Sequence, residues 1–191
     1  MEDIREEKLR EEAWENSFQC YAVAYIMSER ARKLEQLRRM LTFITFLSPI
    51  IVGAVALGYG QHDKSLEYAL KAFIPLAIVQ VVIGLWAQVA KWDDKYGYYI
   101  ESSIANTTLS DDFKSCAKIP VNDNNKLEKQ IDILNTKYSE RGNQDKKYHF
   151  NTKERNRGMR YTLIKFQRKC AGCKEIPTSM IKTECKICGN I

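Results

Sequence analysis

Two long stretches without any charged side chain most restrict how this chain can fold. No Asp, Glu, Lys or Arg occurs in residues 40–61 or 72–90, whereas the rest of the 191-residue chain is dense in charge. About 20 apolar residues in a helix cover the roughly 30 Å hydrocarbon core of a bilayer. The two stretches therefore predict membrane-spanning helices over residues 40–59 and 72–90.

The alternative is a pair of buried helices in a soluble bundle. Such helices normally keep a polar face at 3.6-residue spacing, and neither stretch has a charged one. The polar residues inside the predicted spans are candidates for lining a pore or for hydrogen bonding between helices: Thr42, Thr45, Ser48, Gln80 and Gln88. Because none of them is ionisable, a proton relay or ion-coupled transport is not expected.

Basic residues flank both predicted spans on the same side. They are Arg30, Arg32, Lys33, Arg38 and Arg39 before the first span, and Lys91 and Lys95 after the second. The positive-inside rule then predicts a multi-pass hairpin with both termini in the cytoplasm. A signal peptide is not expected, because the first apolar stretch begins far behind a charged N-terminus.

Amphipathic patterns outside the spans predict a cytoplasmic helical bundle. Residues 4–39 contain no Gly or Pro and are expected to form one helix that runs into the first span. Helices are also expected over residues 92 to about 108 and 126 to about 141, with turn-rich residues 118–125 between them. Apolar stripes at helical spacing favour packing of these helices against one another: Trp14, Phe18, Tyr21 and Tyr25 on the first, and Leu127, Ile131, Leu134 and Tyr138 on the last.

Residues 146–174 are strongly basic, with ten Lys and Arg against one acid, Glu154. Four aromatic residues are interleaved with them: Tyr148, Phe150, Tyr161 and Phe166. This composition is typical of a surface that tracks a phosphate backbone and stacks on bases. It equally fits binding to anionic lipid or a solvated surface, since charge alone is not specific.

The tail carries two CxxC pairs, Cys170/Cys173 and Cys185/Cys188, separated by eleven residues. Four thiolates in this pattern favour a tetrahedral Zn²⁺ site, which is structural because no position remains for water or substrate. A redox CxxC or an iron–sulfur cluster is the alternative. We expect Gly172 and Gly189 to serve tight turns with positive φ, and Ile176 and Ile181 to form a small hairpin core.

No catalytic motif is visible elsewhere. The chain has no P-loop, GxSxG or HExxH sequence, and the expected topology places its two histidines, His62 and His149, on opposite sides of the membrane. The sequence therefore does not predict an enzyme, unless another chain supplies the catalytic residues.

These parts resemble two families. The helix ending in RKLEQLRRM, the two-span hairpin and the helical region after it resemble SLATT-type two-transmembrane effectors of bacterial antiphage and conflict systems. The tail CAGCKEIPTSMIKTECKICGN resembles the CxxC-x11-CxxC proteins of bacterial mobile elements. The first resemblance implies a homo-oligomeric effector of abortive infection in the bacterial inner membrane. There it would open a pore or disrupt the membrane when a nucleotide signal or a lost partner triggers it.

The expected fold is thus an all-α membrane protein in four parts. They are an N-terminal cytoplasmic helix (1–39), a two-transmembrane hairpin (40–90), a cytoplasmic helical region (91–145), and a basic segment with a zinc-ribbon-like module (146–191). A membrane-anchored adaptor, whose basic zinc module binds nucleic acid or a protein partner, is the second hypothesis for its function.

Overall fold

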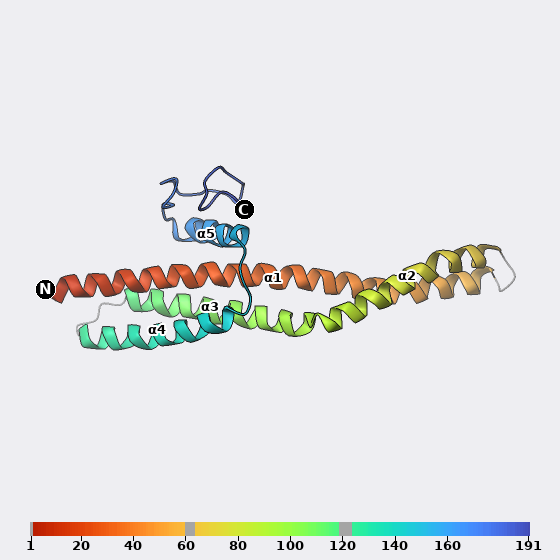
Figure 1. The fold of residues 1–191 in the computed structure, drawn as a ribbon, viewed down its shortest axis with the longest axis horizontal. Coiled ribbons are helices and arrows are strands. Elements are labelled where there is room, and N and C mark those ends of the chain that lie inside the picture. The colour runs from red at the N-terminus through yellow and green to blue at the C-terminus, as the bar shows by residue number, and fades with distance from the viewer. Residues whose placement is uncertain (1, 60–63, 119–123) are drawn as a thin grey trace. The chain divides into compact units, whose positions relative to one another are not determined.

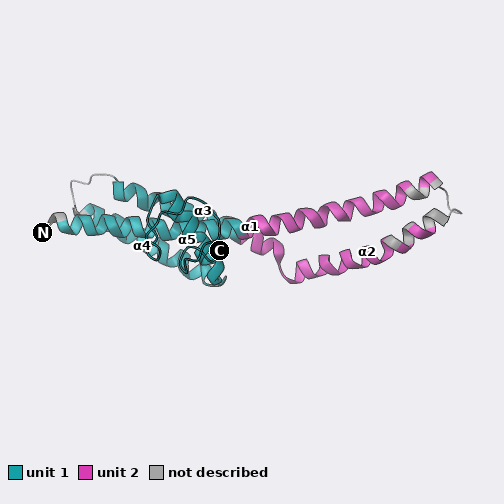
Figure 2. Cartoon of the chain, turned by 90° about the horizontal axis from the view of Figure 1, so that it is seen from above, with its two compact units in different colours: residues 1–29, 99–191 teal, residues 30–98 magenta. Residues whose placement is uncertain are grey.

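The computed structural model describes residues 2–59, 64–118 and 124–191, and the regular secondary structure in these ranges is helical, with no β-strand. The helices are α1 (Glu2–Tyr59), α2 (Lys64–Val89), α3 (Trp92–Lys118), α4 (Asn124–Asp145) and α5 (Thr152–Phe166) (Figure 1). They fall into two compact units, which are Met1–Glu29 with Tyr99–Ile191, and Arg30–Tyr98 (Figure 2). The expected all-helical fold class is confirmed for the described residues.

Helix α1 is continuous over 58 residues, with Pro49 inside it. The prediction that the N-terminal helix runs into the first apolar stretch is therefore confirmed. Helix α3 instead extends ten residues past its expected end near Thr108. The Ser110 hydroxyl donates to the Ser17 carbonyl and the Ser17 hydroxyl to the Ser110 carbonyl, both at 2.9 Å. Serine hydroxyls that bond to nearby backbone favour a turn. The Ser110 hydroxyl bonds to α1 instead, so the helix continues past it.

The core of the first unit lies between α1, α3 and α4. The predicted α4 stripe packs there against Phe113 and other buried residues of α3 and against Ala13 and Cys20 of α1. Residues 119–123 of the predicted turn lie outside the described residues. Burial raises the pKa of the Cys20 thiol to about 12, so this lone cysteine is a core residue with little thiolate character.

The aromatic stripe of α1 packs on a different partner, helix α5. The ring of Tyr161 stacks on Tyr25 with centroids 4.0 Å apart, and the ring of Phe166 lies 5.5 Å from that of Phe18. Gly158 lets the two helices meet, because a Cβ there would lie 2.8 Å from Ile26 and 2.9 Å from the backbone of α1. Helix α1 therefore serves two packing surfaces, one on α3 and α4 and one on α5.

Helix α5 was not predicted from the sequence. It begins with a capping box, in which the Asn151 side chain accepts from the Glu154 N–H at 2.8 Å and the Glu154 carboxylate accepts from the Asn151 N–H at 3.0 Å. Asn followed three residues later by Glu is a recognised start signal. The only acid of the basic segment is thus used to begin this helix.

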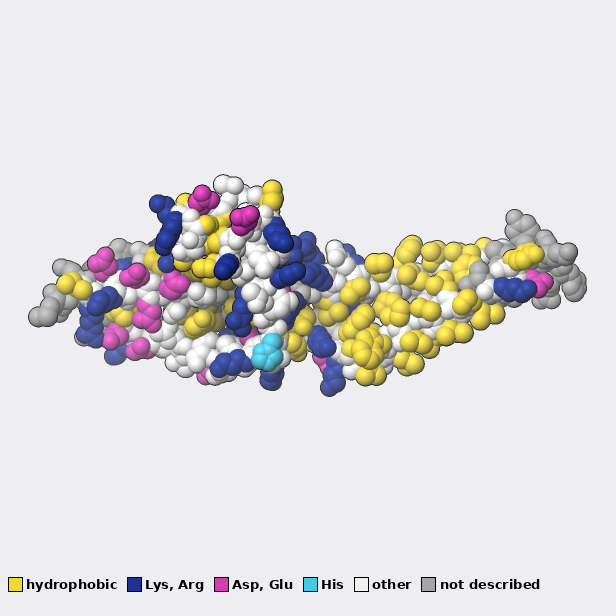
Figure 3. Space-filling model, turned by 45° about the horizontal axis from the view of Figure 1, so that its top comes forward, with side chains coloured by type: hydrophobic (Ala, Val, Ile, Leu, Met, Phe, Trp, Pro, Cys, Tyr) yellow, Lys and Arg dark blue, Asp and Glu magenta, His cyan; other side chains and the backbone are white. Residues whose placement is uncertain are grey.

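The second unit contains a hairpin made by residues 30–59 of α1 and by α2, followed by the start of α3 up to Tyr98. Apolar side chains on its described residues are open to solvent, as Figure 3 shows for one face; Phe43 is 65 % exposed, Ile50 65 % and Leu85 62 %. One helix, within Ile4–Ala54, is long and apolar enough to cross a membrane. A second membrane crossing is indicated only if the helices Phe73–Val89 and Trp92–Lys118, which meet at a bend of 51°, together form one broken span. Length and composition thus weakly indicate a membrane segment.

Candidate metal centre

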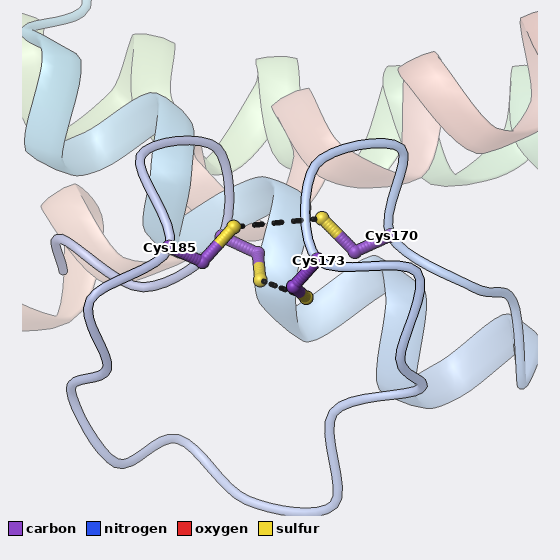
Figure 4. A group of neighbouring side chains, drawn as sticks. Cys170, Cys173 and Cys185 are labelled. Atoms are coloured by element: carbon purple, nitrogen blue, oxygen red, sulfur yellow. Dashed lines mark hydrogen bonds between the residues drawn. The ribbon is translucent and has the colours of Figure 1, made fainter.

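The four cysteines of the tail converge on one point. Their Sγ atoms all lie within 4.8 Å of one another. The two pairs approach each other closely, with 3.9 Å between the Sγ atoms of Cys170 and Cys185 and 3.9 Å between those of Cys173 and Cys188 (Figure 4). Four sulfurs bound at 2.3 Å in a tetrahedron are about 3.8 Å apart. The observed spacing therefore fits one thiolate-bound metal ion.

The two CxxC segments repeat the same turn. The Lys174 N–H donates to the Cys170 carbonyl at 2.9 Å, and the Gly189 N–H donates to the Cys185 carbonyl at 2.8 Å. Each bond joins the first cysteine of a pair to the residue just after the second. Such turns aim both sulfurs of a pair to one side, which a shared metal requires.

Backbone amides in each turn also point at the first sulfur. The Gly172 N–H donates to Cys170 Sγ at 3.4 Å. Backbone bonds from Cys188 and Ile187 lower the pKa of Cys185 to about 6, while burial raises the pKa of Cys188. N–H groups around a sulfur stabilise its thiolate, the form that binds metal.

The expected reason for the two glycines was wrong. The residue with a left-handed backbone is Lys174, at φ 63°, and neither Gly172 nor Gly189 lies in that region. Gly189 is needed for close approach, because a Cβ there would lie 2.2 Å from Thr183 Oγ1 and 2.4 Å from the Thr183 carbonyl oxygen. Gly172 is similarly tight against Ile187 and Cys185, at 3.1 and 3.2 Å.

The predicted hairpin core is also wrong. Ile181 is 70 % exposed and Ile176 is 36 % exposed, and no strand forms in residues 167–191. The buried side chains of the tail are instead Pro177, Cys170 and Cys188, and the two cysteines pack on Phe18 of α1 and on α5. A segment this small has no room for its own core, so it uses the surface of the helices.

Two polar side chains of α5 hold the tail in place, and sequence reasoning missed both. Arg160 is 5 % exposed and donates from Nε to the Ser179 carbonyl at 2.6 Å and from Nη1 to the Cys188 carbonyl at 3.1 Å. One turn earlier, the Asn156 amide donates to the carbonyls of Lys186 at 3.0 Å and Asn190 at 3.3 Å. Their i, i+4 spacing on α5 was the only signal in the sequence.

Part of the basic segment is therefore structural. Arg160 is buried, Arg168 pairs with Glu15 of α1, and the rings of Tyr161 and Phe166 pack on α1. These groups contribute to folding: the Tyr161 ring stacks on Tyr21 and Tyr25, and the Phe166 ring meets the rings of α1 edge-on or tilted. Whether either ring also stacks on bases stays a prediction. The lysines that remain exposed on α5 and in the tail are Lys153, Lys165, Lys169, Lys174, Lys182 and Lys186.

The candidate pore residues lie in the second unit and are not gathered at one place. The Gln80 amide donates to Ser48 Oγ at 2.8 Å and to the Ile44 carbonyl at 3.3 Å, which joins α2 to α1. The Thr45 hydroxyl donates to the Leu41 carbonyl of its own helix at 2.8 Å. Thr42 and Gln88 line a pocket near the start of α3. Whether any of them lines a pore stays a prediction.

The comparisons with known proteins point to the tail and to the chain around it. A family model described as "Mobilome CxxCx(11)CxxC protein" matches residues 10–191. No curated protein matches the chain, and no solved structure does. The family match covers the cysteine centre and the helices on which it packs, so it reaches well beyond the tail motif.

Proposed function

The chain belongs to the family of mobilome CxxCx(11)CxxC proteins, and we propose that it is a bacterial inner-membrane effector encoded on a mobile element. In this proposal the second unit lies in the membrane as a two-span hairpin with both termini in the cytoplasm. Copies of the hairpin assemble and permeabilise the membrane in an antiphage, SLATT-like response. The first unit receives the trigger.

The observation that carries the proposal is the exposure of the second unit. No charged side chain interrupts residues 40–61 or 72–90. Large apolar side chains such as Phe46 (68 %) and Val89 (76 %) are open on its helices. Soluble monomers seldom expose apolar surface on this scale. Lipid or other copies of the hairpin would cover it.

We further propose that the cysteine centre holds Zn²⁺ and that the ion is structural. The chemistry that zinc supplies here is the cross-linking of two turns that lack a core of their own. Cys170, Cys173, Cys185 and Cys188 would bind it. Arg160 and Asn156 hold the second of these turns against α5 through the backbone carbonyls of Cys188 and Lys186.

The experiment is inducible expression in bacteria, with membrane fractionation and a potential-sensitive dye. We expect the wild type in the membrane fraction and a loss of potential. Gln80→Leu and Thr45→Val separate two roles, because Gln80 joins the helices whereas Thr45 bonds only its own helix. A pore-lining role predicts that both change the depolarisation. A packing role predicts that only Gln80→Leu does.

The second candidate function is a membrane-anchored adaptor that binds nucleic acid or an acidic protein. The exposed lysines of α5 and the tail favour it. A protein found in the membrane fraction at high expression, with the potential intact, would contradict an autonomous pore and favour this adaptor. Binding of the purified protein to nucleic acid, falling steeply with salt concentration, would then identify the partner class.

A further inference from the structure

A pocket of about 440 Å³ lies within the second unit, where the uncharged stretch of α1 begins and that of α2 ends. Arg38 precedes the first stretch and Lys91 follows the second, and the pocket brings them together. If the hairpin spans the membrane as proposed, this level is the boundary between hydrocarbon and headgroups. The inference below rests on that part of the proposed function.

The pocket presents both signs of charge. Its lining includes two cations, Arg38 and Lys91, and two carboxylates, Asp93 and Asp94. The remaining lining residues are apolar or neutral: Leu41, Thr42, Ala87, Gln88 and Trp92. A site for a purely anionic headgroup would be expected to carry a surplus of cations. Two charges of each sign instead match a ligand with a positive and a negative group.

The backbone that forms the pocket has an unusual conformation. Lys91 adopts a left-handed φ of 51°, which is uncommon for a residue with a side chain. It stands at the 51° bend between α2 and α3. A left-handed residue commonly ends a helix, and here it ends α2 and sets the direction in which α3 begins. The bend places Asp93 and Asp94 in the first turn of α3, opposite Arg38 of α1.

One side of the pocket is already fixed. The Arg38 guanidinium pairs with Asp93 at 2.8 Å and lies over the Tyr96 ring, 4.9 Å from its centroid. This pairing holds the guanidinium in place, and a planar guanidinium has five N–H donors, more than one carboxylate uses. The side chains of Lys91 and Asp94 are exposed. They are therefore accessible to a ligand that enters from the headgroup layer.

The geometry points to a binding site for a zwitterionic phospholipid, with phosphatidylethanolamine as the occupant. Lys91 and Arg38 bind its phosphate, Asp94 binds its ammonium group, and Trp92 lies at the level of the headgroups. The acyl chains extend along the exposed apolar surface of α1 and α2. The lipid thereby contacts both helices of the hairpin and the bend that follows it.

The test is native mass spectrometry of the purified full-length protein released from detergent. The protein is loaded in turn with phosphatidylethanolamine, phosphatidylglycerol and phosphatidylcholine. We expect selective retention of phosphatidylethanolamine. Loss of one charge-assisted contact, worth about 1.5 kcal/mol, predicts retention about tenfold weaker in Lys91→Gln and in Asp94→Asn. Soluble phosphoethanolamine, added as a competitor, should not displace the lipid, because it lacks the acyl chains.

The matched controls are Lys71→Gln and Glu67→Gln. These two residues form an exposed ion pair at 2.7 Å in α2, outside the pocket, and their variants should retain lipid like the wild type. Equal retention of all three lipids by the wild type would overturn the inference, as would unchanged retention in both pocket variants. If the protein is absent from the membrane fraction, both the lipid site and the proposed membrane function are wrong. A membrane protein that binds the lipid but leaves the potential intact contradicts only the pore.

Discussion

Replacing Gly189 by Ala should disrupt the metal centre although all four cysteines stay in place. The new Cβ would lie 2.2 Å from Thr183 Oγ1, 2.4 Å from the Thr183 carbonyl oxygen and 2.8 Å from the Cys185 backbone nitrogen. Two of these atoms belong to the backbone, so a side-chain rotation cannot relieve the overlap. The loop has to move by about 1 Å to reach ordinary contact distances, which start near 3.4 Å.

The expected cost follows from what that movement breaks. The Thr183 N–H donates to the Gly189 carbonyl at 3.0 Å, and the Gly189 N–H donates to the Cys185 carbonyl at 2.8 Å. Overpacking costs about 1–3 kcal/mol, and each lost backbone bond adds about 1 kcal/mol. With both bonds lost the total is about 3–5 kcal/mol, which would weaken Zn²⁺ binding by about 150- to 4,000-fold.

The assay is competition for Zn²⁺ between the purified protein and a chromophoric chelator. Gly142→Ala is the matched control, because nothing lies within 4 Å of its added Cβ and the site is inside α4. There Ala should leave Zn²⁺ affinity unchanged and stabilise the helix by about 1 kcal/mol. Wild-type Zn²⁺ affinity in Gly189→Ala would contradict this prediction, as would equal losses of affinity in the two variants.

Three further predictions concern how the tail is attached. Arg160→Met should lower the free energy of unfolding by about 2–4 kcal/mol, because it removes charged donors from the carbonyls of the tail. Urea unfolding measures this change, and unchanged stability would contradict the role of Arg160 in attaching the tail. Gly158→Ala should push α5 away from Ile26 of α1 and lower the free energy of unfolding by about 1–3 kcal/mol through overpacking. We expect faster proteolysis of the tail than in the wild type, and an unchanged rate would show that Ile26 moves to make room for the new methyl group. Zn²⁺ removal by a chelator should expose Cys170 to thiol reagents while the far-UV circular dichroism keeps its helical signal; loss of that signal would mean that the ion holds the whole unit.

Local patterns made four of the five described helices and the four converging cysteines predictable. The cysteine spacing named all four thiols that converge, and the α4 stripe named residues that are buried together. Helix α5 was missed although its capping pair, Asn151 and Glu154, is present in the sequence. The basic charge around that pair instead suggested binding to nucleic acid or anionic lipid. The structure shows that several of these groups instead bind the chain itself.

Features that depend on neighbours along the chain could be predicted from the amino-acid order alone: uncharged stretches long enough for a span, helical stripes, and cysteines at ligand spacing. Contacts between distant residues, in contrast, are visible only in the folded chain. Arg160 reaches carbonyls 19 and 28 positions away, and Gly158 meets α1 far earlier in the chain. Backbone carbonyls and close approach have no signature in side-chain periodicity. The role of an arginine or a glycine therefore becomes visible only once the segments are packed.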